Sequence, residues 1–556
     1  MTNDKRNLIR SQKSAKGLFI YGVLALTVAN IVVKSVGLIS KIALNRVVGS
    51  VGAGYYSSAY EIYAFLHIIS TTGLPVALSI MVSKSRARGR FKEAKKIFNM
   101  AFITFLIIGA VFAIGMIMLS SNMAELISAP ETTLCIIAVA PTILFVCLSS
   151  CFRGFFQGHQ MMNQTAISQF IEACCKVLIG VGFALWARAQ GYADHIVAAF
   201  TILGVTTGVF FGMVYLYVRK LFFKDKAINQ EYLAEMKLKN GYCCVEDENC
   251  KSTKQLMKEL IKIAVPITIS SAVLSLTVII DTLMVQNRLL AHGMEENLVR
   301  VYYGDYTSLV VSMSNLPTVL FYPIASALVP LISAAVETKD YKASEKMRSL
   351  SMRVINMIAI PSALGLSIFS YPLLELLMFK ADSVSRAAPW LSIAAISVMF
   401  LGIIASTNAF LNTTGKQSLP IISMLIGAGA KLISNYFLVE YLGIYGAPIS
   451  TVICYLCAAI ANIFFTVKYV GGLPGIKKSV AMPLLCGFIA IGLSALLYFG
   501  MSAFIYSRIA TVFCVFFAIF GYLFLIVKTK TVTTEEILML PNGQKFVKAL
   551  KKLRFL

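Results

Sequence analysis

The sequence predicts an all-α integral membrane protein with about fourteen transmembrane helices. Long apolar stretches recur along the whole chain, and each is long enough to cross a bilayer, which takes about 20 mostly apolar residues. Hydrophobic residues make up 58% of the chain and charged residues only 14%, with a mean hydropathy of +0.77. A soluble domain carries about 25% charged residues, so this composition favours a membrane protein.

The apolar stretches predict helices because they are too long for the strands of a membrane barrel, which need only about 9–11 alternating residues. The first stretch contains Lys34 and Lys41 and is too long for a cleaved signal sequence, so we expect it to be the first span. The expected spans are 18–45, 57–83, 98–120, 132–152, 163–187, 194–218, 259–286, 304–334, 350–371, 385–410, 417–440, 443–467, 480–501 and 504–527.

An internal repeat organises these helices. A shift of 255 residues places Phe155–Lys176 over Phe410–Lys431 without a gap, and the pairs Ser168/Ser423 and Lys176/Lys431 are identical. Chance similarity between apolar helices does not explain a lysine at the same membrane depth in both copies. We therefore expect two parallel six-helix lobes, as in many transporters, and two further C-terminal helices. The expected segments are an N-lobe at 1–218, a cytoplasmic linker at 219–258, a C-lobe at 259–467, the last two helices at 468–527 and a basic tail at 528–556.

The distribution of charge predicts the orientation. Of the 50 Lys and Arg residues, counted with residues at the ends of spans assigned to the adjoining loop, 39 lie in alternate loops and at the two ends, 7 lie in the opposite loops and 4 lie deep within spans. Loops rich in Lys and Arg stay in the cytoplasm, so both termini are expected there. The net charge of +24 does not indicate nucleic-acid binding, because those charges would cluster on one soluble face.

The cysteines and histidines predict neither a disulfide framework nor a cofactor. Most of the 12 cysteines lie in apolar spans, where a free thiol acts as a small hydrophobic group. Cys243, Cys244 and Cys250 lie in the linker without a nearby histidine, whereas a structural zinc site needs four ligands. Cys454 and Cys457 have CxxC spacing inside a predicted helix, which favours packing over redox chemistry. We expect no metal and no cofactor.

Three segments give the chain a family resemblance. They are FRGFFQG at 152–158, TAISQ at 165–169 and GLPVA at 73–77. With the count of twelve helices plus two, they resemble the multidrug/oligosaccharidyl-lipid/polysaccharide exporter superfamily. The resemblance is strongest to its stage V sporulation protein B-like polysaccharide biosynthesis branch, which is related to the MurJ lipid II flippases.

The resemblance implies a function. Two lobes would alternate between inward-open and outward-open states and move an undecaprenyl-diphosphate-linked sugar precursor across the bacterial cytoplasmic membrane. The chain would be a transporter rather than an enzyme, monomeric, in contact with membrane lipids, and used in cell-wall synthesis or sporulation. Three positions depart from the MurJ pattern, namely Tyr55, Ile68 and Ser312. The resemblance therefore leaves open whether the glycan is lipid II or another polysaccharide repeat unit.

Polar residues in the first span are candidates for binding an anionic head group. Asn30, Lys34, Gly37, Lys41 and Asn45 fall within about 80° of one another on a helix. Ionisable residues within the membrane are costly and normally face the protein interior or a water-filled cavity. The alternative is that Lys41 extends toward the membrane surface and only Lys34 is buried.

Lys176 and Lys431 are the other candidate substrate-binding residues. Glu172 lies one helical turn before Lys176, so the two side chains can neutralise each other within the helix. The second copy keeps the lysine but has glycine in place of the acid. Lys431 must therefore find a partner on another helix or bind an anion.

Three acids are candidates for ion coupling or internal ion pairs, namely Glu172, Asp281 and Glu61. Asp281 belongs to the second predicted lobe and can pair with Arg288 on the same helix face, or with Lys34 or Lys431 across the lobes. Glu61 lies near the outer end of its helix, where a carboxylate can also be interfacial. Arg153 lies at the inner end of its helix, where we expect it to anchor the helix at the membrane surface.

Two other classes of function are weighed against the flippase. A cation-coupled multidrug antiporter of the same superfamily needs intramembrane acids, whereas this chain has few acids and several lysines at depth. A membrane glycosyltransferase or ligase needs catalytic carboxylates or a metal near the surface. The four histidines are scattered and form no ligand cluster.

For the flippase, transport of the anionic lipid would be driven by ion coupling or by the membrane potential.

Overall fold

A computed structural model gives the fold of the chain. It describes residues 37, 46–68, 73–87, 90–159, 161–223, 251–322, 324–325, 341–377, 381–413, 416, 418–471, 475, 477–529 and 531. These residues form helices joined by short turns, and no strand occurs among them. The all-α fold class is therefore confirmed. The chain forms two compact units, Met1–Thr282 and Leu283–Leu556.

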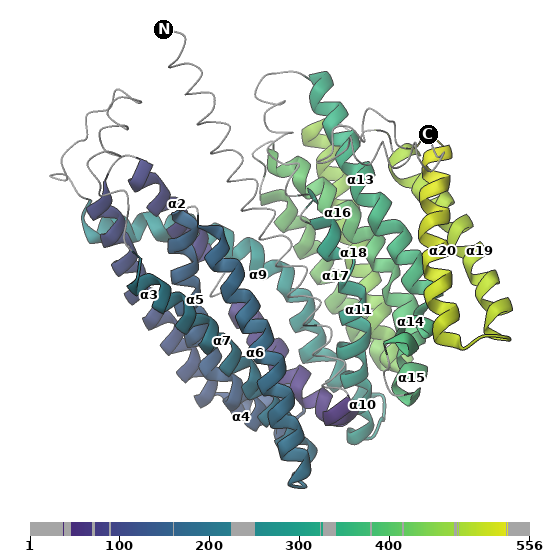
Figure 1. Cartoon of the computed structure of the whole chain (residues 1–556), viewed down its shortest axis with the longest axis horizontal. Helices are drawn as coiled ribbons and strands as arrows, with labels where there is room; N and C mark the ends of the chain where they lie inside the picture. Colours follow the sequence, from purple (N-terminus) through teal and green to yellow (C-terminus); the bar gives the residue numbers. More distant parts are fainter. Residues whose placement is uncertain are drawn as a thin grey trace. The chain divides into compact units, whose positions relative to one another are not determined.

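Unit 1 is a bundle in which α3, α5, α6 and α7 pack side by side (Figure 1). A helix at 46–68 precedes them, and the first part of α9 also belongs to this unit. The bounds are α2 Gly73–Ala87, α3 Phe91–Met118, α4 Ser120–Leu126, η1 Pro130–Thr132, α5 Thr133–Gly158, α6 Met162–Ala189, α7 Asp194–Leu221 and α9 Thr253–Ala291.

Unit 2 repeats this pattern with α16, α17 and α18, and adds α19 and α20 against α13. The bounds are α10 Glu296–Asp305, η4 Tyr306–Val311, α11 Ser312–Asn315, α13 Tyr341–Ile368, α14 Ser370–Leu376, α15 Ala381–Ala394, α16 Ile396–Thr413, α17 Ser418–Leu442, η5 Gly443–Tyr445, α18 Gly446–Val470, η6 Lys477–Ala481, α19 Met482–Ser502 and α20 Ser507–Lys528.

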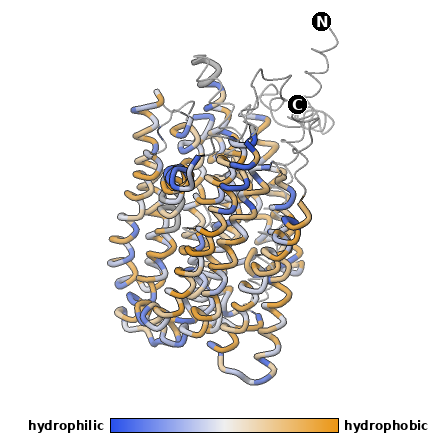
Figure 2. Tube along the Cα trace, turned by 90° about the vertical axis from the view of Figure 1, so that its left-hand side faces the viewer, coloured by the Kyte–Doolittle hydropathy of each residue, from blue (hydrophilic) through white to orange (hydrophobic). Residues whose placement is uncertain are grey.

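Most of these helices are apolar along their length and polar near their ends, as the hydropathy colouring in Figure 2 shows. Within the described part of the chain, ten helical stretches are long and apolar enough to cross a membrane. One of them, Ser418–Val470, contains two of the predicted spans. The multi-pass membrane fold is thus confirmed, while the count of fourteen and the first span, 18–45, stay predictions.

Glycines allow the repeated helices to approach closely. An added Cβ at Gly204 of α7 would lie 2.3 Å from the Cα of Gly180 on α6. In unit 2 the equivalent packing of α17 on α18 depends on Gly427, where a Cβ would lie 2.6 Å from the carbonyl oxygen of Cys454. Close backbone packing through small residues is how helices associate in a membrane, where the hydrophobic effect between helices is absent.

The division between the units falls within α9, between Thr282 and Leu283. The predicted lobes were divided earlier, by the linker at 219–258. The difference has a local cause, because the start of α9 packs on unit 1. Gly73, the first residue of α2, lies so close to α9 that a Cβ would stand 2.2 Å from the carbonyl oxygen of Ala264. Residues 224–250 of the predicted linker lie outside the described part of the chain.

The last two helices are part of unit 2 although they lie outside the repeat. Cys486 of α19 and Tyr522 of α20 form a buried apolar cluster beside Met357 of α13. The chain just after α20 is also held, because buried Arg353 donates a hydrogen bond to the carbonyl oxygen of Thr531 (2.9 Å). These contacts fix α20 against α13.

Candidate functional site

An aromatic row runs along one face of the helix at 46–68 in unit 1. It consists of Tyr56, Tyr60, Tyr63 and His67, which follow one another at intervals of three or four residues. Neighbouring rings in the row have centroids 5.6–5.8 Å apart. Residues at this spacing share a helix face, so the row presents one continuous aromatic surface to its neighbours.

Lys176 of α6 lies against this aromatic row. Its ammonium nitrogen is 4.6 Å from the centre of the Tyr60 ring, within range of a cation–π interaction. Lys176 and Tyr60 are both partly exposed. Among the described residues Lys176 has no ion-pair partner, so its positive charge faces an aromatic ring instead of a carboxylate.

Glu172 forms its ion pair with Arg153 of α5 rather than with Lys176. The Arg153 Nη2 to Glu172 Oε2 distance is 2.7 Å, and Arg153 Nε also donates to the hydroxyl of Ser168 (3.2 Å). The Arg153 side chain is only 15% exposed. The expected role of Arg153 as a surface anchor is therefore wrong, because this side chain turns inward and joins α5 to α6.

Lys431 is buried in α17 of unit 2, with 2% of its surface exposed. Ser423, Gly427 and Asn435 are buried at intervals of four residues on the same helix face. Asn408, which lies at the repeat position of Arg153, accepts a hydrogen bond from Asn462 of α18 (2.7 Å). The buried residues that share this face of α17 with Lys431 are thus a serine, a glycine and an asparagine.

Arg288 has a different partner from the one predicted. Arg288 pairs with Glu440 of α17 (3.1 Å) and stacks over the ring of Tyr436, 3.5 Å from its centre. Asp281 is buried and lies at the end of the part of α9 that belongs to unit 1. The sequence had suggested that it belongs to the second unit.

Glu61 is half-buried, one residue after Tyr60. The first-span candidates Asn30, Lys34 and Lys41 lie outside the described residues.

Unit 2 also contains a buried ion pair that sequence reasoning missed. Asp305 is fully buried at the end of α10, and its Oδ2 accepts hydrogen bonds from Nε (2.9 Å) and Nη2 (2.7 Å) of Arg386 on α15. Nearby, buried Arg300 pairs with Glu296 (2.6 Å) and donates to Gln286 (3.0 Å). In the sequence these arginines resembled ordinary loop charges, so nothing indicated that they were buried.

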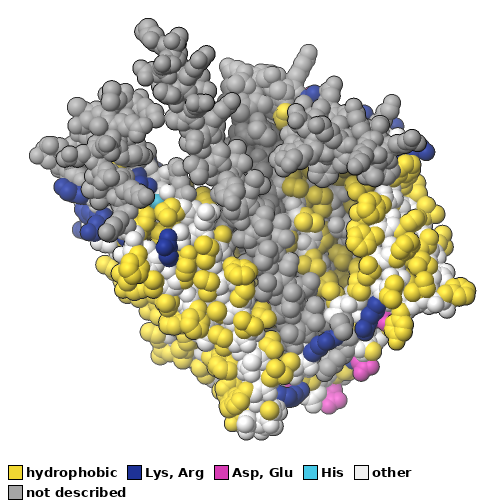
Figure 3. Space-filling view, in the orientation of Figure 1, with side chains coloured by type: hydrophobic (Ala, Val, Ile, Leu, Met, Phe, Trp, Pro, Cys, Tyr) yellow, Lys and Arg dark blue, Asp and Glu magenta, His cyan; other side chains and the backbone are white. Residues whose placement is uncertain are grey.

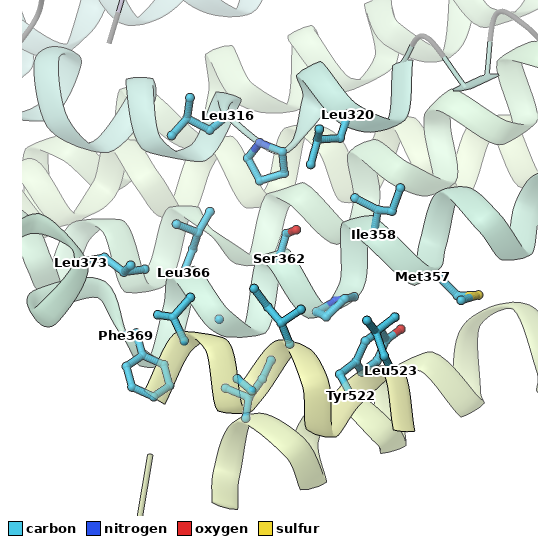
Figure 4. A pocket seen from close by; sticks show the side chains of 17 residues that line it. Leu316, Leu320, Met357, Ile358, Ser362, Leu366, Phe369, Leu373, Tyr522 and Leu523 are labelled. Atoms are coloured by element: carbon cyan, nitrogen blue, oxygen red, sulfur yellow. The ribbon is translucent and has the colours of Figure 1, made fainter. Parts of the chain in front are cut away.

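An apolar cavity lies within unit 2 between residues 316–320, α13 and α20 (Figure 4). Its volume is about 510 Å³, and its walls are aliphatic and aromatic side chains with two polar groups, on Ser362 and Tyr522. Leu316, Ile358 and Leu523 are among the residues that line it. A cavity of this composition suits an apolar chain and offers no partner to a charged ligand.

Among the described residues no group of His, Cys, Asp or Glu is placed to hold a metal ion.

Family profiles identify this multi-pass helical bundle as a membrane transporter of the multidrug/oligosaccharidyl-lipid/polysaccharide exporter superfamily. The chain belongs to the polysaccharide biosynthesis protein family, whose profile matches residues 19–336. The MatE profile matches residues 306–437. The transporter assignment and the resemblance identified from the sequence are thereby confirmed.

Relatives and solved structures agree with this assignment. The chain is 26% identical to stage V sporulation protein B of Bacillus subtilis (strain 168), over 88% of this chain and 92% of that protein. It is 24% identical to lipid II flippase MurJ of the same organism, over 83% and 84%. Its fold is similar to lipid II flippase MurJ in an inward closed conformation, with a TM-score of 0.65, 14% identity and coverage of 90% and 98%. It is also similar to an inward-facing MATE family multidrug transporter, with a TM-score of 0.60, 14% identity and coverage of 79% and 97%.

Proposed function

We propose that this transporter moves a polyprenyl-diphosphate-linked sugar from the inner to the outer leaflet of the bacterial cytoplasmic membrane by alternating access. The observation that carries the proposal is a lysine at the same place in both repeats, Lys176 and Lys431, each within the bundle. The relatives named for lipid II flipping and for sporulation support the same substrate class.

The charge balance around these lysines suits a diphosphate. In unit 1 Glu172 is engaged by Arg153, and among the described residues the partner shown for Lys176 is the ring of Tyr60. In unit 2 the repeat position of that acid is Gly427. A phosphate oxygen accepts strong charge-assisted hydrogen bonds from an ammonium group, and the low dielectric of a membrane protein strengthens them. Asn30, Lys34 and Lys41 remain the proposed contacts from the first span.

The apolar cavity of unit 2 supports a lipid-linked substrate. Its volume of about 510 Å³ accommodates several isoprene units, and its walls have almost no polar groups. Burial of apolar surface contributes about 25 cal/mol per Å². The lipid chain would gain this energy in the cavity while the diphosphate is held by the lysines.

A multidrug antiporter is the second candidate function. The match of the MatE profile and the similarity to a MATE transporter favour it. An antiporter needs intramembrane acids that exchange a cation for a drug. Glu172 is engaged by Arg153, so Asp281 and Glu61 would have to be the acids that exchange the cation for the drug. For the flippase, these three acids remain candidates for ion coupling, with the membrane potential as the other driving force.

Binding to the purified protein distinguishes the two functions. We expect a polyprenyl-diphosphate sugar to bind and to compete with an unlabelled polyprenyl diphosphate, but not with an organic cation such as ethidium. Saturable binding of ethidium, with no binding of the lipid, would reject the flippase in favour of the antiporter. Growth of a bacterial strain depleted of its lipid II flippase then tests the glycan, because rescue by this chain indicates lipid II.

The proposed orientation, with both termini in the cytoplasm, has its own test. Single cysteines at Ser121 and Ser252 in a cysteine-free chain mark opposite sides, and both positions are exposed. A membrane-impermeant thiol reagent added to intact cells should label position 121 only. Labelling at position 252 would contradict the orientation.

A further inference from the structure

The first part of α9 is a helix with two different sides. The whole helix has 39 residues, about twice the number that a membrane span requires. In Figure 1 its start, in teal, lies beside α2 at one end of unit 1. One side of this start is buried, through Leu256 and Leu260. The helix is therefore longer than one span requires, and the loop charges predict that its start lies on the cytoplasmic side.

Ion pairs hold this part of α9 onto unit 1. The Glu259 carboxylate accepts a hydrogen bond from the ammonium group of Lys251 (2.5 Å). One of its oxygens lies 3.8 Å from the ammonium nitrogen of Lys84 on α2. Lys96 of α3 donates a hydrogen bond to the carbonyl oxygen of Lys251 (3.0 Å). Since Lys84 lies at the end of α2, these contacts place the start of α9 beside the end of α2.

The opposite side of the same helix is basic and apolar. Lys254, Lys258 and Lys262 are exposed and follow one another at intervals of four residues, so they share one face. Ile261 and Val265 lie beside them and are 49% and 45% exposed. A helix with lysines next to exposed aliphatic residues is typical of the interface between lipid head groups and acyl chains.

Among the residues that the structure describes, no acid forms an ion pair with these three lysines. Glu259 is engaged as described, and Glu93 of α3 is buried between Arg90 and Ser85. The exposed residues Lys92 and Lys95 on α3 add to the positive charge. Figure 3 shows Lys and Arg side chains gathered at this end of unit 1, next to hydrophobic side chains.

We infer that this surface, made of Lys254, Lys258, Lys262, Ile261 and Val265, docks anionic phospholipids of the inner leaflet. The ammonium groups bind the phosphodiester of a lipid such as phosphatidylglycerol, and the two aliphatic side chains contact its acyl chains. A soluble polyanion would use the charges but leave the aliphatic residues in water. Bound lipid holds the start of α9 on unit 1, and α9 then continues into unit 2.

The test is a lipid titration of the purified full chain in neutral detergent. Phosphatidylglycerol and phosphatidylcholine are added separately, and bound lipid is measured by native mass spectrometry. The variant is Lys254→Gln/Lys258→Gln/Lys262→Gln, and Lys→Arg at the same three positions preserves the charge. The matched control is Lys468→Gln/Lys477→Gln/Lys478→Gln, which removes three exposed lysines from unit 2.

We expect the α9 Gln variant to bind phosphatidylglycerol at least about tenfold more weakly, with phosphatidylcholine binding unchanged. The Arg variant and the unit 2 control should bind phosphatidylglycerol within about twofold of the parent. Parental binding by the α9 Gln variant, or an equal loss in the unit 2 control, would overturn the inference. A loss of polyprenyl-diphosphate sugar binding with phosphatidylglycerol binding retained would also overturn it, and would assign the surface to the transported substrate. The lysines are exposed, so thermal unfolding should be unchanged in every variant.

Discussion

The two lysines of the repeat, Lys176 in unit 1 and Lys431 in unit 2, occupy the same position in different surroundings. In unit 1 an ion pair, Arg153–Glu172, joins α5 to α6. At the repeat positions unit 2 has Asn408 and Gly427, and Asn408 instead joins α16 to α18 through an amide hydrogen bond with Asn462. Unit 1 therefore has a charged pair at these two positions, whereas unit 2 has an asparagine and a glycine there.

Helix packing explains the difference. An added Cβ at Gly427 would lie 2.6 Å from the backbone oxygen of Cys454, so α17 has no room for an acid at this position. In unit 1 the close approach is made by glycines of α7, such as Gly208 next to Glu172, and α6 is free to carry the acid. Two copies of one motif thus differ in charge because the small residue lies on opposite helices of the packed pair.

The largest expected effect comes from filling the space at Gly427. Gly427→Ala should destabilise the protein by about 2–3 kcal/mol, since the methyl group meets backbone that cannot move away. Gly429→Ala on the same helix is the control, because its side faces open space and alanine favours a helix by about 1 kcal/mol. Thermal unfolding in detergent measures both. Equal midpoints for the two variants would contradict the packing explanation.

The next effect is on substrate binding. Lys431→Met and Lys176→Met should each weaken binding of a polyprenyl-diphosphate sugar by about 1.5–3 kcal/mol, the scale of a hydrogen bond to a charged group. Lys→Arg should weaken binding less at both sites, although the planar guanidinium group of arginine differs in shape from an ammonium group. If both Met variants fold and bind like the parent, these lysines do not contact the substrate.

The two helix-joining pairs should differ in strength. A double-mutant cycle on Arg153→Met and Glu172→Gln should give a coupling free energy of about 1–2 kcal/mol, since the pair is only partly exposed. The corresponding cycle on Asn408→Ala and Asn462→Ala should give about 0.5–1 kcal/mol for a neutral hydrogen bond. Unfolding midpoints in detergent supply the four values of each cycle. A stronger coupling in unit 2 would reverse the comparison.

The smallest effect concerns the aromatic partner of Lys176. Tyr60→Leu should destabilise the protein by about 0.5–1 kcal/mol through loss of the cation–π interaction. Tyr60→Phe keeps the ring and serves as the matched control. In a Lys176→Met background the Leu and Phe variants should unfold at the same temperature. A Leu effect that persists there would mean that the ring acts by packing alone.

Much of the fold could be predicted from the sequence, but less of the site. Long apolar runs predicted α6, α7, α17, α18, α19 and α20 to within a few residues, because hydropathy over 20 residues is a local property. They also predicted α3 and α5, but missed the polar start of α3 by seven residues and the end of α5 by six. The repeat predicted that Lys176 and Lys431 would correspond. The partners of Glu172, Arg153 and Arg288 were not predictable, because each depends on which helix lies opposite.

The sequence by itself determined the membrane class, the helical elements, the repeat and the family, since these follow from composition and short-range pattern. Only the tertiary structure decided that Arg153 neutralises Glu172, that Asp305 and Arg386 form a buried pair, and that the start of α9 packs on unit 1. The physical reason is that an ion pair or a close backbone approach needs two helices brought together. Their distance and rotation are set by packing over many residues, which no single stretch of sequence encodes.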